Sequence, residues 1–136
     1  MYLCVAAVIG ASSLIVAPAA FAGAADWLGV ASSPGGVADA DLKAAREDYA
    51  VNCATCHGRN GDGKGELSDS LSVPPRDHTD AKYMGARTDE QLFKAIRDGG
   101  AAVGKAEDMP PHSAVMNDAA IRRMVKYLRR LCDCGK

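Results

Sequence analysis

The amino-acid sequence predicts an all-α domain of three to four helices. Apolar residues recur at helical i+3 and i+4 spacing in several segments, and glycine- and proline-rich stretches separate those segments. No segment shows the alternating pattern that is typical of a strand. The chain has 136 residues, a length typical of a single domain. It contains only two Phe and one Trp, so a large apolar group at its centre would supply much of the missing core.

Residues 1–22 are predicted to be a signal peptide. A charge-free apolar run of 15 residues is followed by small residues that fit an A-x-A cleavage site, Ala20 and Ala22. The run is shorter than the ~20 residues that a membrane-spanning helix needs. Since no Lys or Arg precedes it, the alternative is an uncleaved anchor, with residues 3–22 as a membrane tether.

The rest of the chain divides into an arm and a domain. Residues 23–40 are predicted to be a flexible arm, because Ser32-Ser33-Pro34-Gly35-Gly36 lies within them. Residues 41–136 are predicted to be the folded domain. All 16 basic and 17 acidic residues lie beyond position 22. This near-neutral balance argues against a nucleic-acid partner.

The first helix is predicted to begin near Asp41 and to end at Gly58, because apolar residues recur at helical spacing along it: Leu42, Ala45, Tyr49 and Cys53. A glycine-rich turn follows. Residues 66–87 contain Pro74-Pro75 and no sustained periodicity, so they are predicted to be an extended loop with one short helix.

Two further helices carry clear start signals. Thr88 and Gln91 form a capping box that opens a short helix, and Gly99-Gly100 ends it. Asn117 is predicted to cap a last helix over residues 118–131. One apolar stripe runs along that last helix, and basic residues cover its other face: Arg122, Arg123, Lys126, Arg129 and Arg130.

A C-x-x-C-H motif at Cys53, Cys56 and His57 is the covalent attachment signature of a c-type haem. Two thiols on one helical face can each add to one vinyl group of the same porphyrin, and His57 can then bind the iron. The sequence therefore predicts one haem c, attached through Cys53 and Cys56. The alternatives for C-x-x-C alone are half of a zinc site or a thioredoxin-like redox pair.

A second axial ligand is predicted at Met109. Pro110 and Pro111 follow it and lower the conformational entropy of its loop, and a thioether ligand raises the reduction potential of the iron. The rivals are His112 and His78, because imidazole also binds iron. The other candidate methionines are assigned to packing: Met84, Met116 and Met124.

Two cysteines near the C-terminus, Cys132 and Cys134, have no clear role in this scheme. Together with the motif cysteines they could form a four-thiolate zinc site, which would leave His57 and Met109 unexplained. A disulfide between them is expected to be strained, since side chains two residues apart do not face each other in a helix.

Residues 41–131 resemble class I cytochrome c, in particular its single-haem bacterial subgroup. Besides the C-x-x-C-H motif, four stretches match that subgroup's usual pattern: Pro75-Arg76-Asp77-His78-Thr79-Asp80, Asp89-Glu90-Gln91-Leu92-Phe93-Lys94-Ala95-Ile96, Met109-Pro110 and Tyr127-Leu128-Arg129. The resemblance implies the cytochrome c fold, in which the helices surround one covalently bound haem.

The resemblance also implies roles for particular residues. The carbonyl of Pro75, or else of Pro74, should accept the proton of the far ring nitrogen of His57. Arg76 should pair with a haem propionate. The first and last helices should cross through Ala45, Tyr49, Met124 and Tyr127. Two positions depart from the family pattern, since His78 and His112 stand where aromatic residues are usual.

With protein ligands on both sides of the iron, no position remains for a small-molecule substrate. The sequence therefore predicts an electron carrier rather than an enzyme, exported to the bacterial periplasm, with redox proteins as partners. The first alternative is a cytochrome subunit of a larger oxidoreductase. The second is a haem sensor or peroxidase in which Met109 is displaced.

Overall fold

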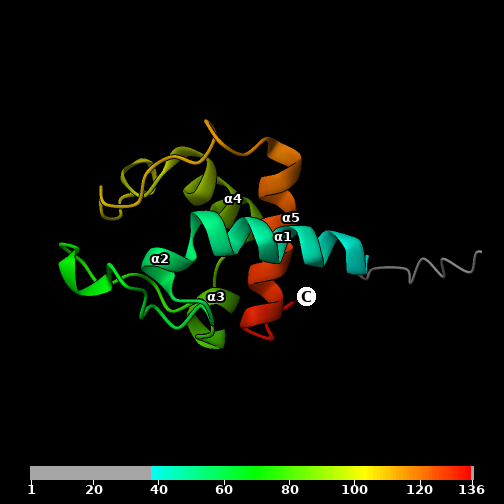
Figure 1. Cartoon of the computed structure of the whole chain (residues 1–136), viewed down its shortest axis with the longest axis horizontal. Helices are drawn as coiled ribbons and strands as arrows, with labels where there is room; N and C mark the ends of the chain where they lie inside the picture. Colours follow the sequence, from blue (N-terminus) through cyan, green and yellow to red (C-terminus); the bar gives the residue numbers. More distant parts are fainter. Residues whose placement is uncertain (1–37, 136) are drawn as a thin grey trace, which may run out of the picture. The chain divides into compact units, whose positions relative to one another are not determined.

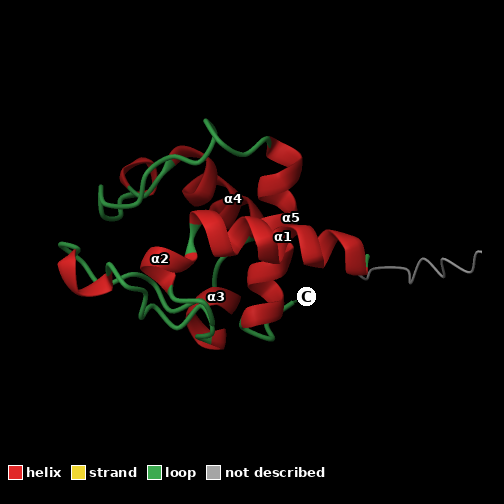
Figure 2. Ribbon diagram, in the orientation of Figure 1, coloured by secondary structure: helices red, strands yellow, loops and turns green. Residues whose placement is uncertain are grey.

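The computed structural model describes residues 38–135, and these residues are helical without any strand (Figures 1 and 2). The elements in chain order are α1 (Asp39–Asn52), α2 (Ala54–His57), η1 (Ser68–Ser70), α3 (Ala81–Gly85), α4 (Asp89–Asp98), η2 (Ala101–Val103) and α5 (Asp118–Leu131). The predicted all-α fold is confirmed. The predicted signal peptide and nearly all of the predicted arm lie outside the described residues.

The helix that carries the motif is divided, which corrects the prediction of one helix reaching Gly58. α1 ends at Asn52, and Cys53 has φ −123° and ψ −37° before α2 begins. The N–H of Cys53 still donates to the carbonyl of Tyr49 at 2.9 Å. The break is therefore local. Neither Asn52 nor Cys53 is a strong helix breaker, so the sequence carried no signal for it.

The starts of α4 and α5 are confirmed. The Thr88 hydroxyl accepts from the N–H of Gln91 at 3.1 Å, and the Gln91 side chain accepts from the N–H of Thr88 at 2.9 Å. The Asn117 side chain accepts from the N–H of Ala120 at 2.9 Å. These side chains satisfy backbone donors that the first helical turn leaves unpaired.

The core forms where α1 crosses α5 (Figure 1). Ala45 and Tyr49 of α1 are fully buried, as is Met124 of α5, and the rings of Tyr49 and Tyr127 lie 5.4 Å apart. The small side chain of Ala45 lets the two helices approach closely. α4 adds its buried apolar side chains to the same cluster: Leu92, Phe93 and Ile96.

The chain leaves the helical path directly after α5. Cys132 and Cys134 form a disulfide with a Cα–Cα distance of 5.1 Å, and Asp133 between them has a left-handed φ of 46°. The expectation drawn from helical geometry does not apply, because α5 ends at Leu131. The four-thiolate zinc alternative is wrong for this structure, since the disulfide uses both of these sulfurs.

None of the helices within residues 38–135 has both the length and the apolar character needed to cross a bilayer.

Candidate functional site

A largely apolar pocket brings together the residues that the sequence analysis singled out. Cys53, Cys56 and His57 line it from α1–α2, and Met109 lines it from the loop before α5. Its apolar lining includes side chains from several elements: Leu71, Val73, Leu92, Ile96, Met124 and Leu128. The pocket therefore combines two thiols, an imidazole and a thioether with a mostly apolar lining.

The attachment motif is held by the glycine-rich loop that follows it. The N–H of Gly65 donates to the carbonyl of Cys56 at 3.1 Å, and the N–H of Leu67 donates to the carbonyl of Thr55 at 3.0 Å. A Cβ on Gly65 would lie 2.2 Å from the Thr55 oxygen. Glycine is required there because the loop backbone packs directly on α2.

Both motif cysteines are free thiols in the pocket. Burial, with smaller contributions from Asp48 and Cys56, raises the pKa of the Cys53 thiol to about 12. Unreacted Cys53 is therefore a neutral thiol at neutral pH. The surroundings do not favour a reactive thiolate, which argues against the thioredoxin-like alternative.

His57 is oriented by a backbone carbonyl. Its Nδ1 donates to the carbonyl oxygen of Arg76 at 2.9 Å, so Nε2 carries the lone pair that a metal would use. The expected acceptor was Pro75. The Pro75 carbonyl instead faces Gly63, where its oxygen lies 2.7 Å from the position of a Cβ. Burial lowers the pKa of His57, and this favours the neutral imidazole that can act as a ligand.

His78 lies beside His57. The two rings stack with centroids 4.1 Å apart and an interplanar angle of 18°, and Nδ1 of His78 is 3.1 Å from the hydroxyl of Tyr49. A stacked imidazole shares its neighbour's side of the pocket, so this geometry disfavours His78 as the ligand facing His57 across the iron. Burial, followed by the charge of His57, lowers the pKa of His78 to about 3.

Met109 sits on a loop that packs against the glycine pair after α4. The N–H of Gly100 donates to the Met109 carbonyl at 2.9 Å. A Cβ on Gly99 would lie 2.9 Å from the same oxygen, and one on Gly100 would lie 3.2 Å from the Met109 Cβ. This glycine pair was predicted only to end the helix. In the structure the Met109 loop also packs directly against this pair.

Other donor groups share the pocket. His112 is buried, its Nε2 lies 3.3 Å from the Asn52 carbonyl, and its Nδ1 has no hydrogen-bond partner. Met84 and Met124 also line the pocket and are almost completely buried. Both methionines were predicted to pack in the core, and both belong to the buried apolar cluster.

Arg76 points its guanidinium at an aromatic ring. Its Cζ lies 3.9 Å from the centroid of Tyr83, and Arg87 stacks on the same ring at 4.5 Å. Arg76 thus contributes two separate features, a backbone acceptor for His57 and a cation at the pocket lining.

Two loops are joined by a contact that no sequence pattern predicted. The N–H of Ser72 donates to Oδ2 of Asp108 at 3.0 Å, and the Ser72 hydroxyl donates to the same oxygen. The two residues are 36 positions apart, and no local pattern pairs them. Asp108 directly precedes Met109, so this contact ties the Met109 loop to the loop that follows the attachment motif.

The family model described as cytochrome C oxidase, cbb3-type, subunit III matches residues 40–128. The chain belongs to this family. The match spans both the motif and Met109, and it confirms the resemblance to c-type cytochromes. A search of curated proteins found no match.

Two solved structures share the fold of this family member. The KustC0563 c-type cytochrome has a TM-score of 0.51 and 22% identity, over 68% of this chain and 98% of that chain. A chain of the Kuenenia stuttgartiensis reducing HAO-like protein complex Kustc0457/Kustc0458 has a TM-score of 0.57 and 20% identity. That match covers 74% of this chain and 47% of the other.

A c-type cytochrome domain holds haem c covalently, and the residues of this pocket fit that group. The two thiols could supply two attachment points, the imidazole and the thioether are groups that can bind iron, and the apolar lining suits a porphyrin. The unpartnered Nδ1 of His112 is a polar atom available to a bound group.

Proposed function

We propose that this chain is an exported, single-haem c-type cytochrome that carries single electrons between redox proteins. Cys53 and Cys56 hold the haem, and His57 and Met109 ligate its iron. The observation that carries the proposal is the orientation of His57. Its Nδ1 is committed to the Arg76 carbonyl, and its depressed pKa keeps the ring neutral in a pocket that Met109 also lines.

The bound haem supplies a one-electron iron couple whose potential a thioether ligand raises. The chain's own residues would hold the two proposed ligands in place when the group is bound. The Arg76 carbonyl fixes the imidazole plane, and the Gly100–Met109 hydrogen bond holds the backbone of the thioether ligand. The apolar lining lowers the local dielectric constant and keeps water from the iron.

We propose a periplasmic location, because the sequence of residues 1–22 is typical of an export signal and haem c is attached in that compartment. Mass spectrometry of the mature protein tests this part. Cleavage gives a chain that begins at Gly23, whereas an anchor leaves residues 3–22 in place and the protein in the membrane fraction.

A second candidate is a cytochrome subunit of a larger oxidoreductase. The observation that favours it is the solved structural relative that belongs to a protein complex. Size-exclusion chromatography of the protein from its native membrane and periplasmic fractions distinguishes a free carrier from a subunit of a complex. A free carrier elutes near its 14.1 kDa mass, less any cleaved signal, and a subunit co-elutes with other chains.

The ligand assignment is tested with visible spectra of the holoprotein matured with haem-attachment machinery. We expect a low-spin spectrum whose oxidised form shows the weak red-edge band of iron–thioether bonding. Met109→Leu should lose that band, and its reduced form should bind carbon monoxide. Met84→Leu is the matched control, since it removes a buried thioether from the same pocket and should keep the band.

Three results would contradict the proposal in different ways. A low-spin wild-type protein without the band would transfer the ligand role to His112. A high-spin wild-type protein would indicate an open iron and favour the sensor or peroxidase alternative. A band that persists in Met109→Leu and disappears in Met84→Leu would reverse the assignment of the two methionines.

A further inference from the structure

The disulfide that follows α5 takes no part in the proposed electron transfer through the haem pocket. It joins Cys132 and Cys134 across a single residue. Cys132 is 3% exposed and belongs to the core, whereas Cys134 is half-buried beside it. The outer sulfur is therefore the more accessible one, at the end of the described chain.

The loop that this disulfide closes is very short. A disulfide stabilises the folded state largely by restricting the unfolded chain, and this effect grows with the length of the closed loop. With a sequence separation of two, Cys132 and Cys134 stay close together even in the unfolded chain. The cross-link therefore contributes little to folding, and a purely structural role explains it poorly.

The residue between the two cysteines has a strained backbone conformation. Asp133 is the one non-glycine residue with positive φ in the described part of the chain, at 46°. Side chains other than glycine reach this region at a cost, although Asp tolerates it better than most. Reduction of the disulfide would free Asp133 to relax, so part of this strain opposes the oxidised form.

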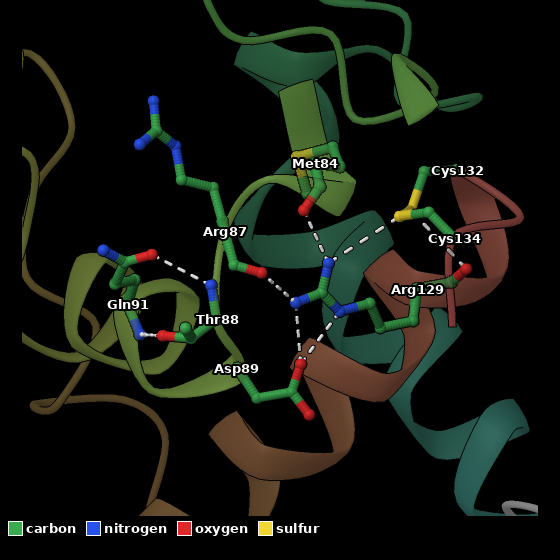
Figure 3. A network of polar contacts seen from close by, with 8 residues as sticks. All are labelled: Met84, Arg87, Thr88, Asp89, Gln91, Arg129, Cys132 and Cys134. Atoms are coloured by element: carbon green, nitrogen blue, oxygen red, sulfur yellow. Dashed lines mark hydrogen bonds and ion pairs between the residues drawn. A yellow bond between two sulfur atoms is a disulfide. The ribbon is translucent and has the colours of Figure 1, made fainter. Parts of the chain in front are cut away.

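A fixed cation lies against the outer sulfur (Figure 3). Nη1 of Arg129 is 3.7 Å from Sγ of Cys134. The guanidinium is held in place by the carbonyls of Met84 and Arg87, each at 2.6 Å, and by the Asp89 carboxylate at 2.8 Å. A guanidinium beside a sulfur stabilises the thiolate and so favours the reduced pair.

From the short loop, the strained Asp133 and the guanidinium of Arg129, we propose that Cys132 and Cys134 form a second redox site. The site exchanges two electrons with a dithiol of a partner protein, separately from the haem. Residues at the end of α5 thus form a thiol–disulfide exchange site on a one-electron carrier.

The exchange proceeds in two balanced steps. A partner thiolate attacks Sγ of Cys134, the Cys132–Cys134 bond breaks, and the Cys132 sulfur leaves and takes up a proton. The partner's second thiol then loses its proton to water and attacks the partner sulfur in the mixed disulfide. Cys134 leaves as a thiolate beside Arg129. The partner becomes a disulfide, and this chain has gained its two electrons.

The test is a glutathione redox titration of the oxidised holoprotein, quenched with an alkylating agent and digested with trypsin. Cleavage after Arg130 releases residues 131–136, which carry both cysteines and no other thiol. Mass spectrometry counts zero or two alkyl groups on this peptide. We expect half-reduction within the glutathione series, and an equilibrium constant for reduction that is about threefold to tenfold lower in Arg129→Gln.

Matched variants separate exchange chemistry from a folding defect. Arg129→Lys keeps the positive charge, so its equilibrium constant for reduction should stay close to that of the wild type. Asp133→Gly removes the backbone strain outside the Arg129 network and should lower the constant about threefold to fivefold, with Asp133→Asn as its control. A wild-type peptide that stays oxidised in reduced glutathione alone overturns the proposal. The proposal is also overturned if none of these variants changes the equilibrium constant for reduction.

Discussion

The two ligand-bearing sides of the pocket are built very differently. On the side of His57, the loop after the motif returns to α2 through backbone hydrogen bonds, including Gly63 to His57 at 2.8 Å, and the imidazole has a backbone acceptor of its own. On the side of Met109, backbone hydrogen bonds at Gly100 and His112 attach the loop to the end of α4, and an exposed contact between Ser72 and Asp108 attaches it to the loop after the motif.

This difference matches the chemistry proposed for each side. The His57 side has to hold two covalent attachments and one ligand, and its buried packing leaves little freedom. On the Met109 side, none of residues 101–111 is buried, and segments with few buried contacts open at low free-energy cost. If the iron ligand is ever displaced, we expect Met109 to leave and His57 to stay.

The largest expected effect tests the rigidity of the His57 side. Gly65→Ala places a Cβ 2.2 Å from the Thr55 oxygen and 2.6 Å from the Cys56 oxygen, so the loop must separate from α2. We expect a loss of about 3 kcal/mol or more in the free energy of unfolding, measured by denaturant titration.

The matched control is Gly104→Ala in the Met109 loop. A Cβ there meets nothing within 4 Å, and the cost is limited to its φ of 69°. We expect the free energy of unfolding to fall by about 1 kcal/mol. Equal losses in the two variants would show that close packing on the Thr55 and Cys56 oxygens does not decide the cost at Gly65.

The next effect concerns acid stability on the His57 side. Burial lowers the pKa of His78 to about 3, whereas His in the unfolded chain titrates near 6.5. Between these values the unfolded state binds the proton and the folded state does not. Stability therefore falls as the pH drops from 6.5 towards 3, by about 2 kcal/mol at pH 5 from this residue alone.

His78→Phe keeps a stacking ring beside His57 and removes this titration. We expect a flatter dependence of the melting temperature on pH between 6.5 and 3, with a small loss at pH 7 because the Tyr49 hydroxyl loses its partner. A pH profile as steep as that of the wild type would show that His78 is not buried as a neutral ring.

The smallest effect tests the exposed contact on the Met109 side. Asp108→Ala removes both hydrogen bonds from Ser72 and frees the residue before Met109. We expect a global loss of only about 1 kcal/mol, but a measurable rate of carbon monoxide binding to the reduced holoprotein as Met109 opens more often.

Glu107→Ala is the control, because it removes an exposed carboxylate from the same loop one position earlier. It should bind carbon monoxide as slowly as the wild type. If Asp108→Ala and Glu107→Ala behave alike, the Ser72–Asp108 contact does not hold the Met109 loop.

Much of the fold follows from short-range patterns. The α4 capping box and the Asn117 cap were predictable, because both are formed by residues three positions apart. The apolar stripe of α5 likewise predicted four buried residues, Ile121, Met124, Val125 and Leu128, whereas Leu131 of the same stripe is only half-buried. The spacing of Cys53, Cys56 and His57 was sufficient to indicate the attachment chemistry.

Other features escaped prediction because they depend on residues far apart in the chain. The acceptor of His57 proved to be Arg76 rather than Pro75, since the path of the loop past Gly63 turns the Pro75 carbonyl away. The stacking of His78 on His57 required the same loop to pack against α1. The helix break at Cys53 had no sequence signal.

The sequence by itself determined the helical class, the family and the set of candidate haem ligands, because helix caps, apolar periodicity and the C-x-x-C-H spacing are local chemistry. The tertiary structure decided which backbone carbonyl orients His57, where His78 lies, and how Asp108 and Arg129 reach their partners. These are contacts between segments brought together only by the packing of α1, α4 and α5. Their geometry depends on how the whole core closes, and no short stretch of sequence encodes it.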